Sequence, residues 1–236
     1  MMQNWSPDAI RFMQDAASHS KYHRRLAARI APHLPPHASV CDAGCGLGDL
    51  SVALAPLCGH VTAVDRAPAP IAALRARKLP ENMQVLCADI FTLEQRFDAM
   101  VFCYFGRIEE ILRLSSRLCR ETVAVVKRCE RVSLFSMRPT PSEHRVAAEA
   151  EALLRERGIA FHSEPLTLEL GQPFRSLDDA ERFFALYDRS GTPPDRDEIA
   201  ERLQQTDDAQ FPLYLPAIRR MELLILRADA IREALL

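Results

Sequence analysis

The feature that most constrains the fold of this chain is a glycine-rich stretch at residues 40–51, which reads Val-Cys-Asp-Ala-Gly-Cys-Gly-Leu-Gly-Asp-Leu-Ser. It begins apolar, carries glycines at positions 44, 46 and 48, and continues into a helical pattern. A strand that passes through a glycine turn into a helix is expected to bring free backbone N–H groups close to a ligand, because no Cβ blocks the approach. The Gly-x-Gly-x-Gly spacing differs from the Gly-x-Gly-x-x-Gly pattern of dinucleotide-binding proteins. The stretch therefore predicts a ligand site that differs from that of the dinucleotide-binding proteins.

The sequence around this stretch alternates between strand and helix patterns. Short apolar runs at residues 40–43, 61–64, 85–88, 99–105 and 122–126 are separated by helical segments at 49–57, 70–79 and 108–118. Apolar strands separated by helices are typical of a parallel sheet that is covered on both faces. Because such crossovers are right-handed, the pattern predicts a doubly wound α/β sheet.

The remaining segments are expected to extend the same domain. Two helices precede the first strand, and they either cover the mouth of the site or pad one edge of the sheet. After the fifth strand we expect helices at 142–157, 177–187 and 195–203, with strands at 166–170 and 222–227. We therefore predict one domain over residues 1–236. Its parts are N-terminal helices (1–38), a ligand-binding core (39–134), and a helical insertion with the last strands (135–236).

Composition excludes several classes of function. The 236 residues carry a formal net charge of -2, so no global field attracts nucleic acid or an anionic membrane. No apolar run reaches the roughly 20 residues that span a bilayer, and the N-terminus lacks the features of a signal peptide, so we expect a cytoplasmic protein without membrane contact. The seven cysteines mostly lie in apolar runs and are expected to be reduced thiols. The pairs His19/His23 and His33/His37 lack an evident third ligand, and we predict no metal site.

Acidic residues follow the second and third predicted strands. Asp65 ends the second strand, where a carboxylate can accept both hydroxyls of a ribose. Asp89 and Ile90 follow the third strand and offer a polar side chain and a backbone N–H to an adenine edge. Either acid alone fits an ordinary turn. In register with the glycine stretch, at the carboxyl ends of neighbouring strands, they favour a nucleoside ligand.

These residues together resemble a known family. The stretch 42–48 is similar to motif I of the class I S-adenosylmethionine-dependent methyltransferases, Asp-x-Gly-x-Gly-x-Gly. Asp65 matches the acidic residue that this family carries after strand two, residues 88–90 its adenine motif, and 97–103 its motif IV strand. The resemblance extends from about Tyr22 to the C-terminus. It implies a seven-stranded sheet with an antiparallel last strand, and S-adenosylmethionine as the cofactor.

The resemblance also implies roles for individual residues. Gly44 and Gly46 would approach the methionine part of the cofactor with Asp42 near its amino group, and Asp65 would bind the ribose. The complete implied cofactor set is Tyr22, Asp42, Ala43, Gly44, Cys45, Gly46, Asp65, Arg66, Asp89, Ile90, Cys103 and Tyr104. His23, beside Tyr22, is a further candidate for closing over the cofactor.

The acceptor is less constrained. The family's nucleic-acid amino methyltransferases carry Asn/Asp-Pro-Pro-Tyr after strand four, whereas residues 103–106 read Cys-Tyr-Phe-Gly, which argues against that route. We expect direct displacement onto a small molecule, with Tyr104, Arg138, Glu143 and His144 as acceptor contacts and Tyr104 and His144 as catalytic candidates. A solvated loop explains residues 137–144 equally well. The alternatives are an RNA or protein acceptor, for which basic residues between 113 and 131 would form a patch, and a protein that binds the cofactor without catalysis.

Overall fold

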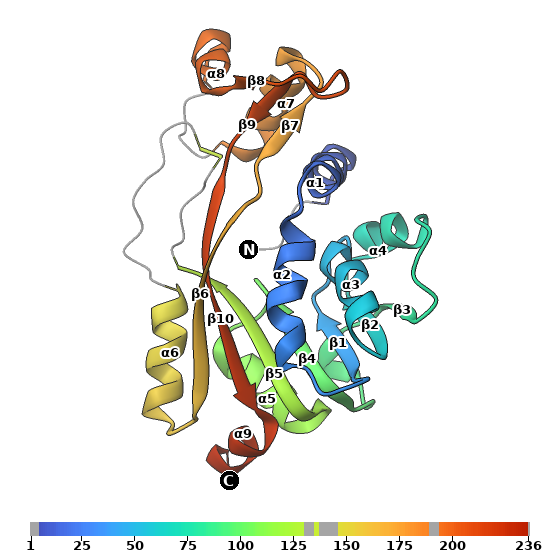
Figure 1. The fold of residues 1–236 in the computed structure, drawn as a ribbon, viewed down its shortest axis with the longest axis vertical. Helices are drawn as coiled ribbons and strands as arrows, with labels where there is room; N and C mark the ends of the chain where they lie inside the picture. Colours follow the sequence, from blue (N-terminus) through green and yellow to red (C-terminus); the bar gives the residue numbers. More distant parts are fainter. Residues whose placement is uncertain (1–4, 130–134, 137–145, 189–193, 236) are drawn as a thin grey trace.

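The centre of the protein is a seven-stranded sheet with the strand order β3-β2-β1-β4-β5-β10-β6, seen in a computed structural model that describes residues 5–129, 135–136, 146–188 and 194–235 (Figure 1). Strands β1 to β5 pair in parallel, and β10 pairs antiparallel with both β5 and β6. The predicted doubly wound sheet with an antiparallel last strand is confirmed. The strands are β1 (Ser39–Ala43), β2 (His60–Asp65), β3 (Met83–Cys87), β4 (Phe97–Cys103), β5 (Cys119–Arg128), β6 (Phe161–Glu169) and β10 (Ile218–Arg227).

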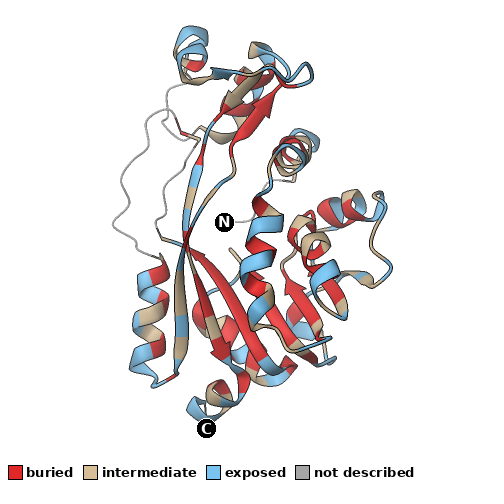
Figure 2. Ribbon diagram, viewed as in Figure 1, coloured by how far each residue is buried: buried red, intermediate tan, exposed pale blue. Residues whose placement is uncertain are grey.

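Helices cover both faces of this sheet and bury its central strands, whereas the edge strands β3 and β6 are mostly intermediate or exposed (Figure 2). One face packs against α2 (Tyr22–Ile30) and α3 (Asp49–Leu54), and the other against α5 (Ile108–Leu118), α6 (Val146–Glu156) and α9 (Ala228–Ala234). The short helix α4 (Pro68–Arg75) connects β2 to β3. Strands that are apolar on both faces therefore read as continuous apolar runs in the sequence.

A second, smaller unit is inserted between β6 and β10. Its three short strands form a sheet in the order β7-β9-β8, and it also contains two helices. The helices match the predicted insertion, but the small sheet was not predicted. Figure 1 shows this unit beyond the carboxyl end of β6, next to α1 (Pro7–His19). Its elements are β7 (Gln172–Phe174), α7 (Leu177–Tyr187), α8 (Arg196–Arg202), β8 (Gln204–Gln205) and β9 (Leu213–Leu215).

The helix α1 is fixed to the inserted unit by aromatic contacts. Ser6 caps its first turn by accepting a hydrogen bond from the N–H of Ala9 at 3.2 Å. Phe12 is fully buried, and its ring meets those of Phe174 and Phe183 edge-on, with centroids 6.3 and 5.1 Å apart. The N-terminal helix thus lies over the space between the sheet and the insertion.

All seven cysteines are free thiols, as expected. Within the described ranges, the protein contains no helix with the length and apolar character needed to cross a membrane.

Candidate functional site

The glycine turn after β1 has a backbone that only glycine adopts readily. Gly44, Gly46 and Gly48 have φ angles of 75°, 55° and 71°. A Cβ on Gly44 would lie 2.2 Å from Cδ2 of Phe105, and a Cβ on Gly46 would lie 3.1 Å from Cη2 of Trp5. The first two glycines therefore allow other groups to approach the backbone closely.

The N–H groups of this turn are engaged within the protein. Gly44 and Cys45 both donate to the carbonyl of Val64, at 2.8 and 3.0 Å, and Gly48 donates to the carbonyl of Cys45 at 2.9 Å. The N–H of Gly46 donates to Oδ2 of Asp65 at 2.9 Å. The expectation of free N–H groups is thus wrong at these four positions, because the turn uses them to fasten itself to β2. The positions that side chains would fill at Gly44 and Gly46 are taken by the rings of Phe105 and Trp5, and both glycines line the cavity described below.

Asp65 stands at the end of β2 beside the turn. Its two carboxylate oxygens accept the N–H groups of Gly46, at 2.9 Å, and Ala67, at 2.8 Å. A carboxylate has about four acceptor positions, so one lone pair on each oxygen is left for ligand hydroxyls. The backbone therefore holds Asp65 in a fixed orientation toward the space above the turn.

Asp42 is almost fully buried beneath the turn, where Oδ2 accepts a hydrogen bond from Oγ of Ser51 at 2.5 Å. Burial raises the pKa of Asp42 to about 6. The Ser51 hydrogen bond opposes this rise, and the charge of Asp65 adds to it.

A cavity of about 700 Å³ lies above the glycine turn. One wall is the turn itself with Asp65 and Arg66, and α1 and α2 contribute Met13, Ala16, Tyr22 and His23. The inserted unit closes the far side. Among the described residues, six line this side of the cavity. Gln172, Phe183 and Tyr187 belong to the inserted unit, Leu170 and Gly171 precede it, and Phe135 comes from an earlier part of the chain. The N-terminal helices were expected either to cover the mouth of the site or to pad one edge of the sheet. Their residues line the cavity, so the first expectation is confirmed.

Tyr104 follows β4 directly and lines this cavity. Its φ of 56° is rare for a residue other than glycine, and such a backbone persists only where the surroundings enforce it. The hydroxyls of Tyr22 and Tyr104 are hydrogen-bonded at 2.7 Å, and each lies 3.4–3.5 Å from the sulfur of Met221. Burial raises the pKa of both phenols, so both are neutral at pH 7.

Sequence and structure comparisons agree with this arrangement. Residues 40–128 match the sequence model of a family described as a methyltransferase domain. Those residues are a class I, S-adenosylmethionine-dependent methyltransferase domain. The match ends with β5 and does not reach the inserted unit.

Solved structures share the fold of this methyltransferase at low sequence identity. A putative type II methyltransferase from Anaeromyxobacter dehalogenans has a TM-score of 0.54 and 18% identity, with 89% of this chain and 97% of that chain covered. A putative methyltransferase from Bacillus halodurans gives 0.52 and 15%, covering 87% and 98%. Precorrin 8w decarboxylase from Methanobacterium thermoautotrophicum gives 0.51 and 17%, covering 86% and 88%. No curated protein matches the sequence.

Most of the expected cofactor residues line the cavity of the methyltransferase. They are Tyr22, Asp42, Gly44, Cys45, Gly46, Asp65, Arg66, Cys103 and Tyr104, and the further candidate His23 joins them. Ala43 and Ile90 are instead buried in the core, and Asp89 is exposed. The Asp89 carboxylate caps the short helix that follows it by accepting the N–H of Phe91 at 3.0 Å. Its adenine role stays a prediction. The acceptor candidates Arg138, Glu143 and His144 lie outside the described residues.

Several lining residues carry no local sequence signal. Trp5 precedes the first helix, Arg128 and Arg219 end or begin strands, and Phe183 and Tyr187 lie on a helix of the insertion. Trp5, Phe183 and Tyr187 reach the cavity because the N-terminal segment and the inserted unit lie against it. Arg128 and Arg219 reach it because β5 and β10 pair in the sheet. A pattern along the chain does not report such contacts. The chain's single tryptophan is the one residue among them that composition singles out.

Trp5 gives a direct readout of cofactor binding. S-adenosylhomocysteine, the demethylated cofactor, is expected to shift the Trp5 fluorescence to shorter wavelength, because a ligand on the turn would displace water from the half-buried indole beside Gly46. NAD should leave the emission unchanged, and Trp5→Phe should bind without a signal. An unchanged emission maximum under conditions where calorimetry detects binding would place the ligand elsewhere.

The buried Asp42 predicts a pH-dependent stability. Its folded-state pKa of about 6 lies above the usual 3.8, so the unfolded chain loses this proton first as pH rises. The contribution of Asp42 to stability is therefore complete below about pH 4 and is lost as pH rises through 6. A rise of about two units corresponds to roughly 3 kcal/mol. Urea unfolding at pH 4 to 7 should show this loss in the wild type relative to Asp42→Asn, and parallel profiles would contradict it.

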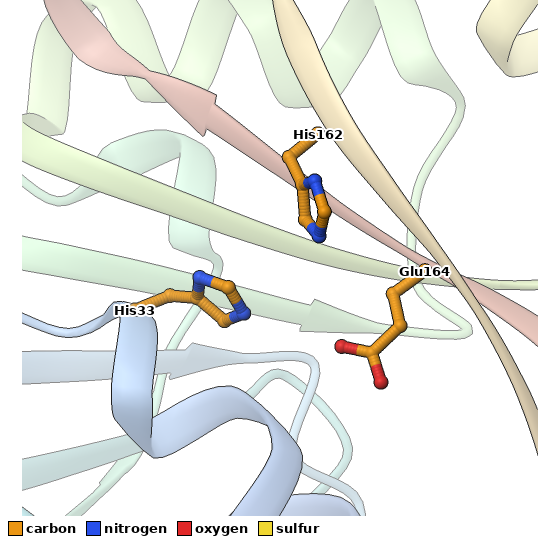
Figure 3. Close-up of side chains that lie close together, drawn as sticks. All are labelled: His33, His162 and Glu164. Carbon is orange, nitrogen blue, oxygen red and sulfur yellow. The ribbon is translucent and has the colours of Figure 1, made fainter.

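Three potential metal ligands meet at the opposite end of the sheet from this site (Figure 3). The side chains of His33, His162 and Glu164 each offer one ligand atom, and these atoms lie within 4.8 Å of one another. The expectation that His33 lacks a third ligand is therefore corrected, because β6 supplies partners distant in sequence. Arg29 already forms a close ion pair with Glu164. Burial, and then the neighbouring His162 and Arg29, lower the pKa of His33.

Proposed function

We propose that this protein transfers the methyl group of S-adenosylmethionine to a small molecule bound in the same cavity. The observation that carries the proposal is the continuity of that cavity. It extends from Asp65 and the glycine turn, past Tyr104 at the end of β4, to Phe183 and Tyr187 of the insertion. Its volume of about 700 Å³ lies within the range of roughly 300–1,000 Å³ that is usual for small-molecule sites.

The residues of the first wall fit the cofactor. The methionine part is assigned to the cavity beside Gly44 and Gly46, and Asp65 presents two fixed acceptors to ribose hydroxyls. Asp42 lies beneath the turn as the carboxylate for its amino group. When bound, the cofactor supplies a methyl group on a positively charged sulfur, which is already a strong electrophile. The protein then needs chiefly to align the acceptor and exclude water.

Tyr104 is the residue placed to align the acceptor. Because burial keeps its phenol protonated at neutral pH, Tyr104 acts as a hydrogen-bond donor and positions a polar group of the acceptor. His144 remains our candidate for accepting a proton, with Arg138 and Glu143 as further acceptor contacts. These three residues precede α6 in the sequence.

The surroundings of the cavity favour a small molecule over RNA or protein. Access is covered by α1, which is fastened to the insertion through Phe12. The basic residues between 113 and 128, the part of this range that the structure describes, do not form one surface at this opening. Arg113 and Arg117 belong to α5, which packs on the opposite sheet face from α2 and α3. Arg117 donates to the Phe91 carbonyl, and Arg120 pairs with Asp98 at 3.2 Å.

A labelling experiment tests this function. S-adenosylmethionine labelled in its methyl group is incubated with the protein and a cell extract, which is then separated into small molecules, RNA and protein. We expect label in the small-molecule fraction, and none with the variant Asp65→Ala. Label confined to RNA or protein would refute the acceptor class. Tight cofactor binding without any transfer would identify a non-catalytic cofactor-binding protein.

A further inference from the structure

We propose that Arg128 and Arg219 bind an anionic group, a carboxylate or phosphate, on the methyl acceptor. This inference rests on the proposed function and adds the chemical class of the acceptor. Both residues line the cavity.

The strand register brings these arginines together. Arg128 ends β5 and pairs directly with Met221 on β10, so the two side chains lie on the same face of the sheet. Arg219 precedes Met221 by two residues on β10 and therefore shares this face. Met221 is the residue whose sulfur meets the hydroxyls of Tyr22 and Tyr104. The two cations thus border the position assigned to the acceptor.

Neither guanidinium has a carboxylate partner among the described residues. Arg128 lies over the ring of Tyr104 at 4.8 Å, and Arg219 over the ring of Phe135 at 4.9 Å. The Nε of Arg219 is buried without a hydrogen-bond partner. Burial first, and the charge of Arg128 second, lower the pKa of Arg219. Two neighbouring cations with an unsatisfied buried donor are costly unless an anion binds them.

The cofactor's own carboxylate is the other possible anion, and the sheet order argues against it. β5 and β10 are two and three strands away from β1, which at about 4.8 Å per strand is roughly 10 and 14 Å from the strand that carries the glycine turn. The walls near the arginines are aromatic, with Phe135, Phe183 and Tyr187. The ligand that matches both features is an apolar, preferably aromatic, molecule that bears a carboxylate or phosphate.

The test uses simple anions on the protein saturated with S-adenosylhomocysteine. Benzoate, phenylacetate, phenyl phosphate and inorganic phosphate are titrated by calorimetry, with benzamide as the neutral counterpart of benzoate. At least one aromatic anion should bind, and benzamide should bind at least tenfold more weakly than benzoate. Arg219→Gln should weaken the anion about 10- to 100-fold, as for loss of a charge-assisted hydrogen bond. The matched control is Arg220→Gln, since Arg220 is exposed and does not line the cavity, and it should bind like the wild type.

Different outcomes show whether the anion site, the acceptor assignment or the proposed function is wrong. If no anion binds, or benzamide equals benzoate, or Arg219→Gln binds the anion unchanged, the anion site is refuted. If Arg219→Gln or Arg128→Gln weakens S-adenosylhomocysteine itself by more than about tenfold, the arginines bind the cofactor carboxylate and the acceptor assignment falls. If the wild type does not bind S-adenosylhomocysteine at all, the proposed function fails before the anion site is tested.

Discussion

Replacing Asp65 by alanine is expected to weaken S-adenosylmethionine binding on the order of 100- to 1,000-fold. In the proposed complex the carboxylate presents one oxygen to each of two ribose hydroxyls, and a hydrogen bond to a charged group contributes about 1.5–3 kcal/mol. The same substitution frees the N–H groups of Gly46 and Ala67, which Asp65 holds at 2.9 and 2.8 Å. The turn that receives the methionine part therefore loosens as well. Titration calorimetry measures the loss.

Two further variants separate charge from turn geometry. Asp65→Asn keeps an oxygen for one backbone N–H but removes the charge, and it should bind with an intermediate affinity. Asp207→Ala removes an exposed carboxylate outside the cavity and should bind like the wild type. All three variants should remain folded by circular dichroism. Unchanged affinity in Asp65→Ala would exclude Asp65 from the ribose site.

The core of the fold was predictable from sequence because its constraints are local. Strands β1, β2, β4 and β5 are largely buried and so read as apolar runs, and the helices between them show their own periodicity. The small sheet of the insertion was missed because β8 has two residues and β7 and β9 have three each. Segments this short show no alternation. They are strands because of the partners that the tertiary structure gives them.

The residues of the site also divide into those that local sequence patterns predict and those that they do not. Asp42, Gly44, Gly46 and Asp65 were predictable because each lies at or just after the carboxyl end of β1 or β2. The residues on the proposed acceptor side of the cavity were not predictable, because Arg219 and Phe183 come from segments more than 110 residues after the glycine turn. Asp89 shows that a local sequence signal can also have a structural explanation. Its position after β3 suggested a ligand contact, yet its carboxylate caps a helix turn.

The second large effect is expected for Phe12→Ala, a substitution in α1, which forms one wall of the cavity. Phe12 is fully buried between Phe174 and Phe183, and removing such a ring usually costs about 3–5 kcal/mol. Because α1 joins the rest of the protein mainly through the insertion, we expect this cost to appear first as release of α1. Hydrogen exchange in residues 7–19 should then accelerate, and urea should unfold the variant at lower concentration.

Loss of this wall should impair turnover more than cofactor binding. Met13 and Ala16 of α1 line the cavity, so released α1 admits water and leaves the acceptor poorly held. Arg11 also pairs with Asp179 at 2.6 Å and Arg175 pairs with Asp15, so a network of ion pairs between α1 and the insertion remains in the variant, and the effect measured is that of the Phe12 ring alone. Phe91→Ala makes the same substitution at an exposed ring and should change stability by less than about 0.5 kcal/mol. Equal effects of the two variants, or unchanged exchange in α1, would show that Phe12 does not fasten this wall.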